Sequence, residues 1–256
     1  MNAGAGIESR SAAADAVIWH DVECGGYAAD LALWSDLAAE HRGPVLELGS
    51  GTGRVALTLA AAGAGVSGVD TGSRLIDALN ARAAARSLPA RGLVADARTA
   101  EPGGEFALII APMQLIQLLG GPGDRGALMA SARQRLAPGG VLALAIVEGT
   151  PAAAQRDAGQ ASPIPDVAEH EGWVYSSLPL GIEPLGERLL IRRLRQRVAP
   201  GGFMDEALDE TSLAVLDAAV IEAEAAAAGL RARHRLLVPT TADHIGSTVV
   251  VLEAAS

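Results

Sequence analysis

Residues Val45 to Arg54, which read Val-Leu-Glu-Leu-Gly-Ser-Gly-Thr-Gly-Arg, decide the fold of this chain. A largely apolar segment runs directly into a turn in which every second residue is glycine. Glycine carries no Cβ, so the backbone of such a turn can approach a ligand closely. The pattern therefore predicts a strand, a ligand-binding turn and a helix that begins near Gly53.

An acidic residue ends the next predicted strand. Asp70 closes segment 65–70, about 20 residues after the glycines, where an acid can accept hydrogen bonds from ribose hydroxyls. A dinucleotide site needs Gly-x-Gly-x-x-Gly, but Arg54 takes the place of the third glycine. Glu47 would also repel a pyrophosphate and attract a cation. These features favour an adenosine-containing ligand with a cationic group.

The composition excludes several classes of protein. The chain has 256 residues, 50% of them hydrophobic, and a net charge of −10. This acidity disfavours a nucleic-acid partner, since phosphate binding depends on clustered Lys and Arg. The lone Cys24 excludes an internal disulfide framework, and the N-terminal residues lack a secretory pattern. No apolar stretch approaches the length of about 18 residues that a membrane span needs. We expect a cytoplasmic protein that crosses no membrane.

Strand and helix patterns alternate along the first 150 residues. The apolar runs predict strands at 44–48, 65–70, 91–95, 106–111 and 140–147. Helical spacing predicts helices at 28–41, 53–62, 73–86 and 124–137. Apolar strands separated by helices of this size predict a parallel sheet with right-handed crossovers.

The rhythm changes after Glu148. A loop is expected at 150–166, followed by extended segments at 173–180, 187–198 and 203–211. A helix at 213–228 ends before Gly229, and two strands at 233–238 and 248–252 finish the chain. The extended segments therefore form an insertion after the fifth strand.

The Glu-x-Gly-x-Gly-x-Gly turn, together with Pro138-Gly139-Gly140 before the fifth strand, resembles the Rossmann-like (class I) S-adenosylmethionine-dependent methyltransferases. The resemblance covers residues 44–148 and 213–252. It implies an α/β fold: a seven-stranded, mostly parallel sheet flanked by helices, with a strand-rich insertion after the fifth strand. The implied organisation is a tail and lid helix (1–42), the cofactor-binding half (43–149), a β insertion on the substrate side (150–212) and a C-terminal helix with strands (213–256).

The same resemblance implies S-adenosylmethionine as cofactor and a role for several positions. Glu47 would reach its α-ammonium, Asp70 the ribose and Asp96 the adenine amino group. The remaining implied cofactor-facing residues are Tyr27 in the lid, Gly49, Ser50, Gly51 and Gly53 in the turn, Ala97 beside the adenine, and Pro112 and Met113 near the transferring methyl. No metal is implied. The Asn-Pro-Pro-Tyr motif of base and amide methyltransferases is absent.

Methyl transfer of this type is a direct displacement that leaves S-adenosylhomocysteine. A general base is needed only when the acceptor is protonated at neutral pH. Asp243 and His244, in the connection between the last two strands, are our candidates, although His244 can equally be an ordinary loop histidine. Other candidates for a substrate-facing role are Glu148, His170, Glu171 and His20.

Five arginines occur between Arg188 and Arg197. They form either an anion-binding patch or a solvated strand face paired with acids such as Asp205 and Asp209, and we favour the second interpretation. The insertion also resembles additions that cover the substrate or join subunits, which suggests a small-molecule substrate and a homodimer. Two alternatives to a methyltransferase stay open: a silent S-adenosylmethionine-binding regulator or scaffold, and an NAD(P)-dependent oxidoreductase.

Overall fold

The computed structural model describes residues 15–149, 164–241 and 244–255. Its larger sheet has seven strands in the order β10-β11-β5-β4-β1-β2-β3, and β11 pairs antiparallel with both of its neighbours. The other pairings in this sheet are parallel. The strands are β1 (Val45–Leu48), β2 (Val66–Asp70), β3 (Ala90–Val94), β4 (Phe106–Ala111), β5 (Leu136–Ile146), β10 (Leu230–Val238) and β11 (Ser247–Ala254). The predicted seven-stranded, mostly parallel sheet is confirmed.

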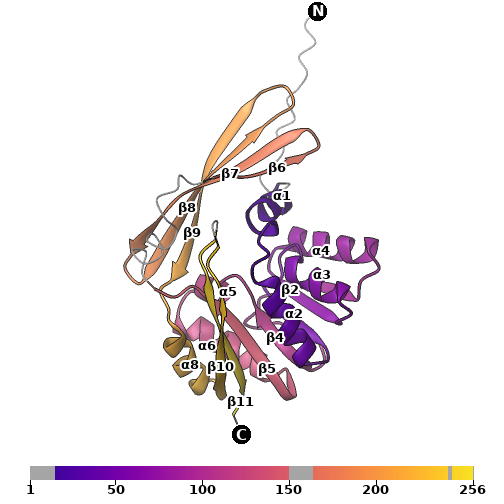
Figure 1. Ribbon diagram of the computed structural model, residues 1–256, viewed down its shortest axis with the longest axis vertical. Coiled ribbons are helices and arrows are strands. Elements are labelled where there is room, and N and C mark those ends of the chain that lie inside the picture. Colours follow the sequence, from indigo (N-terminus) through magenta and orange to yellow (C-terminus); the bar gives the residue numbers. More distant parts are fainter. Residues whose placement is uncertain (1–14, 150–163, 242–243, 256) are drawn as a thin grey trace, which may run out of the picture.

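Helices cover both faces of this sheet (Figure 1). On one face, α2 (Leu31–Glu40), α3 (Arg54–Ala61) and α4 (Ser73–Ala85) enclose a core that includes Trp34 and Leu59. On the other face, α5 (Leu115–Leu118), α6 (Pro122–Arg133) and α8 (Ala218–Ala227) enclose a core that includes Met129 and Ile221. None of the helices in the described residues is long and apolar enough to cross a membrane.

The sheet order reverses between β1 and β4, because β1 leads to β2 and β3 on one side while β4 leads to β5 on the other. In open α/β sheets, ligands bind at such a switch point, beyond the carboxyl ends of the strands. The glycine turn follows β1, Asp70 ends β2 and Pro112 follows β4. The topology therefore brings these segments to one edge of the sheet.

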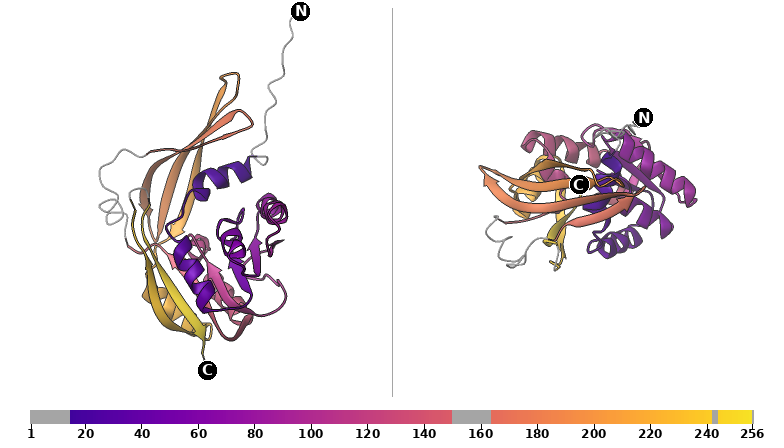
Figure 2. Two further views of the ribbon diagram at one scale, coloured as in Figure 1. Left: turned by 45° about the vertical axis from the view of Figure 1, so that its right-hand side comes forward. Right: turned by 90° about the horizontal axis from the view of Figure 1, so that it is seen from above.

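The insertion forms a second sheet, which projects beyond the first (Figure 1). Its four strands are antiparallel in the order β6 (Asp166–His170), β7 (Trp173–Leu185), β8 (Arg188–Val198) and β9 (Met204–Ala214). Figure 2 shows α1 (Ala16–His20) between this sheet and the core. The π-helical turn η1 (Asp21–Gly25) continues α1 and contacts β6 and β7.

Four of the five arginines of β8 pair with acids, as the favoured interpretation predicted, while Arg188 binds Ser212. Arg195 lies 2.6 Å from Asp209, and Arg197 lies 2.8 Å from Asp205 on the neighbouring strand. The same two arginines also bind acids at the N-terminal end of the described chain. Arg195 bonds Glu23 at 2.6 Å and Arg197 bonds Asp15 at 2.5 Å. This face of the insertion therefore holds α1 and η1 in place.

Several predicted elements differ from those in the structure. Helix α6 ends at Arg133 and β5 begins at Leu136, because Leu136 pairs with Phe106 before a shift in register. Segment 213–214, predicted as helix, ends β9, since Leu213 and Ala214 are buried there as strand residues. Strand β6 extends to His170, although no strand was predicted there.

Gln117 fastens both ends of the insertion to the core. Its side chain is fully buried, and its Nε2 donates to the carbonyls of Val147 at 3.1 Å and Ala214 at 2.9 Å. Its Oε1 accepts from the Val147 N–H at 2.8 Å. Val147 lies just after β5, and Ala214 is the last residue of β9. One amide group thus satisfies backbone groups where the chain leaves the core and where it returns.

Candidate functional site

The turn after β1 has a backbone that requires glycine. Gly49, Gly51 and Gly53 have φ values of 69°, 52° and 94°, a region that residues with a Cβ rarely adopt. The turn is fixed to β2, because the N–H groups of Gly49 and Ser50 donate to the Val69 carbonyl at 2.8 and 3.0 Å. Gly53 begins α3, where an added Cβ would lie 3.0 Å from Leu57. An added Cβ at Gly49 or Gly51 would likewise meet a side chain, that of Leu115 or His20, so the turn has no room for a residue larger than glycine at these positions.

Asp70 holds the turn from the neighbouring strand. Its Oδ2 accepts from the Gly51 N–H at 2.9 Å, and its Oδ1 accepts from the Gly72 N–H at 2.8 Å. A carboxylate offers about four acceptor positions, so both oxygens of this partly exposed side chain can accept further hydrogen bonds. Asp70 therefore supports the turn and keeps acceptor positions for further donors.

Two polar atoms in or beside the turn are buried without a partner. Among the described residues, Glu47 Oε2 and Ser50 Oγ belong to a set of three such side-chain atoms, the third being His41 Nε2. Burial raises the pKa of Glu47 to about 8, while the nearby Arg54 acts in the opposite direction. Buried polar groups are normally hydrogen-bonded. Glu47 Oε2 and Ser50 Oγ, beside the glycine turn, therefore remain available for hydrogen bonds to a polar ligand.

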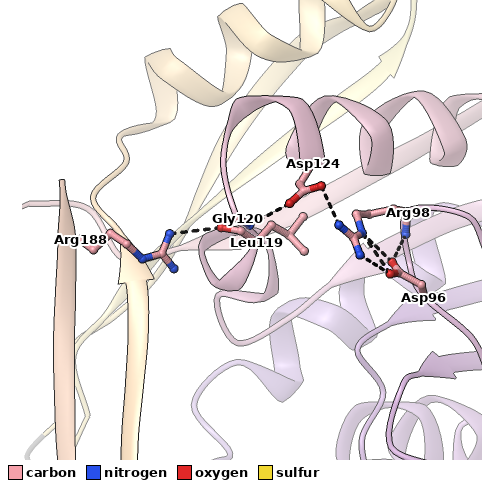
Figure 3. A network of polar contacts seen from close by, with 6 residues as sticks. All are labelled: Asp96, Arg98, Leu119, Gly120, Asp124 and Arg188. Carbon is pink, nitrogen blue, oxygen red and sulfur yellow. Dashed lines mark hydrogen bonds and ion pairs between the residues drawn. The ribbon is translucent and has the colours of Figure 1, made fainter.

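Asp96 follows β3, and its carboxylate lies against Arg98 (Figure 3). Hydrogen bonds from the Arg98 side chain and backbone lower the pKa of Asp96, so this carboxylate is ionised at neutral pH. Ala97 is partly buried against the core. Asp96 is therefore a charged acceptor at the far end of the sheet from β10.

The segment after β4 carries backbone strain. Pro112 is buried, and the two residues after it, Met113 and Gln114, have φ values of 49° and 59°. Such conformations are uncommon for residues other than glycine, and they concentrate at functional sites. Met113 is partly buried against the cluster that contains Tyr27. The strand end and the predicted lid thus meet here.

Tyr27 is fixed over the first turn of α3 by a buried ion pair. Arg54 binds Asp30 through two hydrogen bonds of 2.6 and 2.8 Å, and its Nη1 also donates to the Tyr27 carbonyl at 2.8 Å. The guanidinium carbon lies 5.1 Å from the centre of the Tyr27 ring. His244 lies on the other side of this tyrosine, with a distance of 4.8 Å between the ring centres. The structure therefore brings Tyr27 and His244 together, while Asp243 lies outside the described residues.

His20 is the residue at this site that the sequence marked least clearly. An added Cβ at Gly51 would lie 2.2 Å from its Nε2, so the ring rests directly on the turn. Its Nδ1 lies 3.2 Å from the hydroxyl of Thr52, which donates its own hydrogen to Asp21 at 2.7 Å. His20 Nδ1–H must then be the donor, and Nε2 faces Gly51 as an acceptor. Burial lowers the pKa of His20, which keeps the ring neutral at pH 7.

A cavity of about 450 Å³ opens between His20 and the insertion. Trp19, Leu75 and Ala207 contribute apolar surface to it, and Arg195 and Arg197 form part of its wall. His20 borders both this cavity and the glycine turn. The space provides room for a small molecule next to the candidate ligand site.

The other candidates lie away from the turn or are engaged elsewhere. Glu148 accepts from the Ala218 N–H at 2.6 Å and from the Thr248 hydroxyl at 2.5 Å. It thereby holds the start of α8. His170 and Glu171 lie 3.9 Å apart at the β6–β7 turn, with largely exposed side chains. In the parts of the chain that the structure describes, no three His, Cys, Asp or Glu side chains gather to hold a metal ion.

Comparisons with known proteins agree with this arrangement. Residues 45–140 match the family model of a methyltransferase domain. Among solved structures, the CcbJ methyltransferase from Streptomyces caelestis is 23% identical, with 91% of this chain and 92% of that chain covered and a TM-score of 0.67.

Two further solved structures are similar over most of their length. The amino pentose methyltransferase CalS10 from Micromonospora echinaspora, solved with S-adenosylmethionine bound, is 20% identical (91% and 96% covered, TM-score 0.68). The sugar N-methyltransferase KedS8 from Streptoalloteichus sp. is 18% identical (92% and 91% covered, TM-score 0.69). No curated protein sequence matches.

We predict that replacing Glu47 by Gln stabilises the protein at alkaline pH. The folded-state pKa of about 8 lies above the value of 4.5 that applies to the unfolded chain. The native state therefore binds more protons between these values, and the wild-type free energy of unfolding falls as pH rises through this window. The free energy of unfolding of Glu47→Gln minus that of the wild type should therefore increase between pH 5 and pH 8 and stay constant above this range. The total increase is at most about 5 kcal/mol.

Urea unfolding at a series of pH values measures this difference. The exposed Glu101, whose side chain is 87% accessible, provides the control Glu101→Gln, which should show no such trend. A difference between Glu47→Gln and wild type that is the same at pH 5 and pH 9 would contradict the raised pKa.

Proposed function

We propose that this chain, whose residues 45–140 match the model of a methyltransferase domain, transfers the methyl group of S-adenosylmethionine to a small molecule. The observation that carries this proposal is the glycine turn, in which the Gly51 N–H donates to Asp70 Oδ2, together with the buried atoms Glu47 Oε2 and Ser50 Oγ, which have no hydrogen-bond partner. A cationic amino acid joined to a ribose satisfies all three groups.

Each part of the cofactor has a candidate partner in the described residues. Asp70 accepts from the ribose hydroxyls, and Asp96 accepts from the adenine amino group beside the Ala97 N–H. Glu47 and Ser50 serve the methionine end, over the backbone of Gly49, Gly51 and Gly53. Tyr27, Pro112 and Met113 border the place where the reacting group lies. When bound, S-adenosylmethionine supplies an electrophilic methyl group on a sulfonium.

The protein's own part in the reaction is to align the acceptor and to exclude water. Arg54 holds Tyr27 in place, and Met113 packs against the hydrophobic cluster that contains Tyr27. These two side chains therefore do not need to become ordered during the reaction. His244 stands next to Tyr27 and has an exposed side chain. We assign to His244, with Asp243 beside it in sequence, the removal of a proton from acceptors that are protonated at neutral pH.

We assign to the cavity between α1 and the insertion the part of the acceptor that lies beside His20, since neither Tyr27 nor His244 lines this cavity. The 450 Å³ cavity has room for a compact molecule rather than a polymer. Two similar structures are an amino pentose methyltransferase and a sugar N-methyltransferase. Small amines, amino sugars among them, are therefore the first acceptors to test. Mass spectrometry of a metabolite extract incubated with the enzyme and S-adenosylmethionine would identify the methylated product.

We also propose a cytoplasmic homodimer that is joined through the insertion. The single cysteine supports the reducing compartment. Large apolar side chains of the insertion support the dimer, since Val174, Met204 and Leu208 are 39%, 53% and 64% exposed. Exposed apolar groups that gather on one element indicate an interaction surface.

Replacing Asp70 by Asn should weaken binding of S-adenosylhomocysteine by about 1–3 kcal/mol, because the variant loses the charge that strengthens hydrogen bonds from the ribose. Isothermal titration calorimetry measures the change. Asp77→Asn, on the exposed side of α4, is the matched control and should bind as the wild type does. Equal affinity of Asp70→Asn and the wild type would remove Asp70 from the site.

Replacing His244 by Ala should lower kcat at least tenfold for an amine acceptor and leave cofactor affinity nearly unchanged, since general-base catalysis typically contributes 10²–10⁴-fold. Steady-state kinetics and calorimetry together separate the two effects. The exposed His234 on β10 supplies the control His234→Ala. Full activity of His244→Ala would end its assignment as a base.

Leu208→Arg should convert the dimer into a monomer, because it places a charge in the apolar surface of the insertion. Sedimentation velocity at micromolar concentration reports the change in mass. A wild-type protein that sediments as a monomer at the same concentration would refute the proposed assembly.

A further inference from the structure

The strongest unexplained contact at the site is between Asp96 and Arg98. The Arg98 N–H donates to Asp96 Oδ1 at 2.9 Å, and Nε lies 3.0 and 3.1 Å from the two carboxylate oxygens. Nη2 donates to Oδ2 at 2.5 Å. The guanidinium therefore faces the carboxylate as a fork, the geometry that fixes the direction of an acid as well as its charge.

Arg98 is itself held from the other side. Its Nη1 donates to Asp124 Oδ1 at 2.6 Å, from the first turn of α6 (Figure 3). Asp124 Oδ2 accepts in turn from the Gly120 N–H at 3.2 Å. The guanidinium thus spans two carboxylates on different elements and cannot turn without breaking one pair. A single surface ion pair would not restrain it in this way.

The network ends in the insertion. Gly120 N–H and the Leu119 carbonyl belong to one peptide group, and this carbonyl accepts from Arg188 Nη1 at 3.3 Å. Arg188 also binds Ser212 on β9 through its side chain and backbone, at 2.7 and 2.8 Å. One peptide group is therefore held on both sides, by the insertion and by Asp124. This peptide group therefore holds Asp124, which in turn binds Arg98.

The contacts with Arg98 restrict what Asp96 can do. Three hydrogens of Arg98, those on N, Nε and Nη2, contact the carboxylate, and the Nε–H is shared between both oxygens. A carboxylate offers about four acceptor positions. One acceptor position of the Asp96 carboxylate therefore remains, and it can accept from one further donor. The exocyclic amino group of adenine supplies such a donor. Hypoxanthine, the base of inosine, has an oxo group in place of this amino group. Its N–H lies on the neighbouring ring atom, which the Asp96 carboxylate could reach only by a change of its orientation.

We propose that Arg98 is a positioning residue that fixes the direction of the Asp96 carboxylate and so selects a cofactor whose base carries an exocyclic amino group. The proposal rests on the proposed function, since it needs Asp96 at the adenine end of a bound cofactor. Asp124 is the second support, because it holds the free side of the guanidinium. The selection between bases therefore depends on the direction of the Asp96 carboxylate as well as on its charge.

The test compares two ligands that differ only at this group: S-adenosylhomocysteine and S-inosylhomocysteine, each titrated by calorimetry. The wild type should prefer the amino compound on the order of 10- to 100-fold, the range expected for a hydrogen bond to a charged group. In Arg98→Gln the preference should fall to about threefold or less, because a freed carboxylate loses the amino group and reaches the N–H of the inosine base.

Two further variants separate direction from charge. Arg98→Lys keeps the charge but has no fork, so it should lose the preference as Arg98→Gln does. Asp124→Asn should show an intermediate preference. Arg235→Gln, which removes a similarly exposed arginine paired with Glu222 at 2.7 Å, is the control and should behave as the wild type does.

The outcomes distinguish this proposal from the proposed function. If the wild type prefers the amino compound and Asp96→Asn abolishes that preference, while Arg98→Gln or Arg98→Lys retains it, the role of Arg98 is refuted and the function stands. If Arg98→Gln weakened the binding of both ligands equally, the positioning role would likewise be refuted, because such a result would indicate a general loss of the binding site. A wild type that binds neither ligand would refute the proposed function itself.

Discussion

The buried ion pair between Arg54 and Asp30 is the interaction on which the rest of the site depends. Arg54 stands where a dinucleotide site would have its third glycine, and its side chain reaches across to Asp30 and the Tyr27 carbonyl. Asp30 is 3% exposed and also accepts from the Trp34 ring N–H at 2.9 Å. Removing one partner of a buried pair leaves an uncompensated charge and is strongly destabilising. Arg54, which replaces the third glycine of the dinucleotide motif, therefore joins the segment of Tyr27 and Asp30 to the glycine turn.

The insertion is tied to this site at both ends. Arg195 and Arg197 hold η1 and α1 through Glu23 and Asp15, which places His20 on the glycine turn. Gln117 fixes the points where the insertion leaves and rejoins the core. The cavity between α1 and the second sheet is thus bounded by elements that are attached to the larger sheet and its helices.

The sequence predicted the parts of the structure that depend on local chemistry. Alternating glycines can be recognised without tertiary information because their backbone conformation excludes other residues, and an acid that ends a strand is recognised in the same way. Residues that act through distant contacts could not be predicted. Nothing in the sequence distinguishes Gln117 from other helical glutamines before the fold brings Val147 and Ala214 to it. His20 was a candidate, but its contact with Gly51 depends on the tertiary fold and could not be predicted. The wrong boundary at 213–214 has the same origin, since tertiary pairing overrode helical spacing there.

The central claim is that the edge of the sheet between β1 and β4 binds S-adenosylmethionine through the glycine turn and Asp70. A crystal structure of the protein grown with S-adenosylhomocysteine tests it most directly. The account predicts the ribose hydroxyls on Asp70, the amino-acid end over Gly49 to Gly53 and the adenine amino group on Asp96. An empty crevice at saturating ligand, or NADP bound there in its place when both are offered, would contradict it.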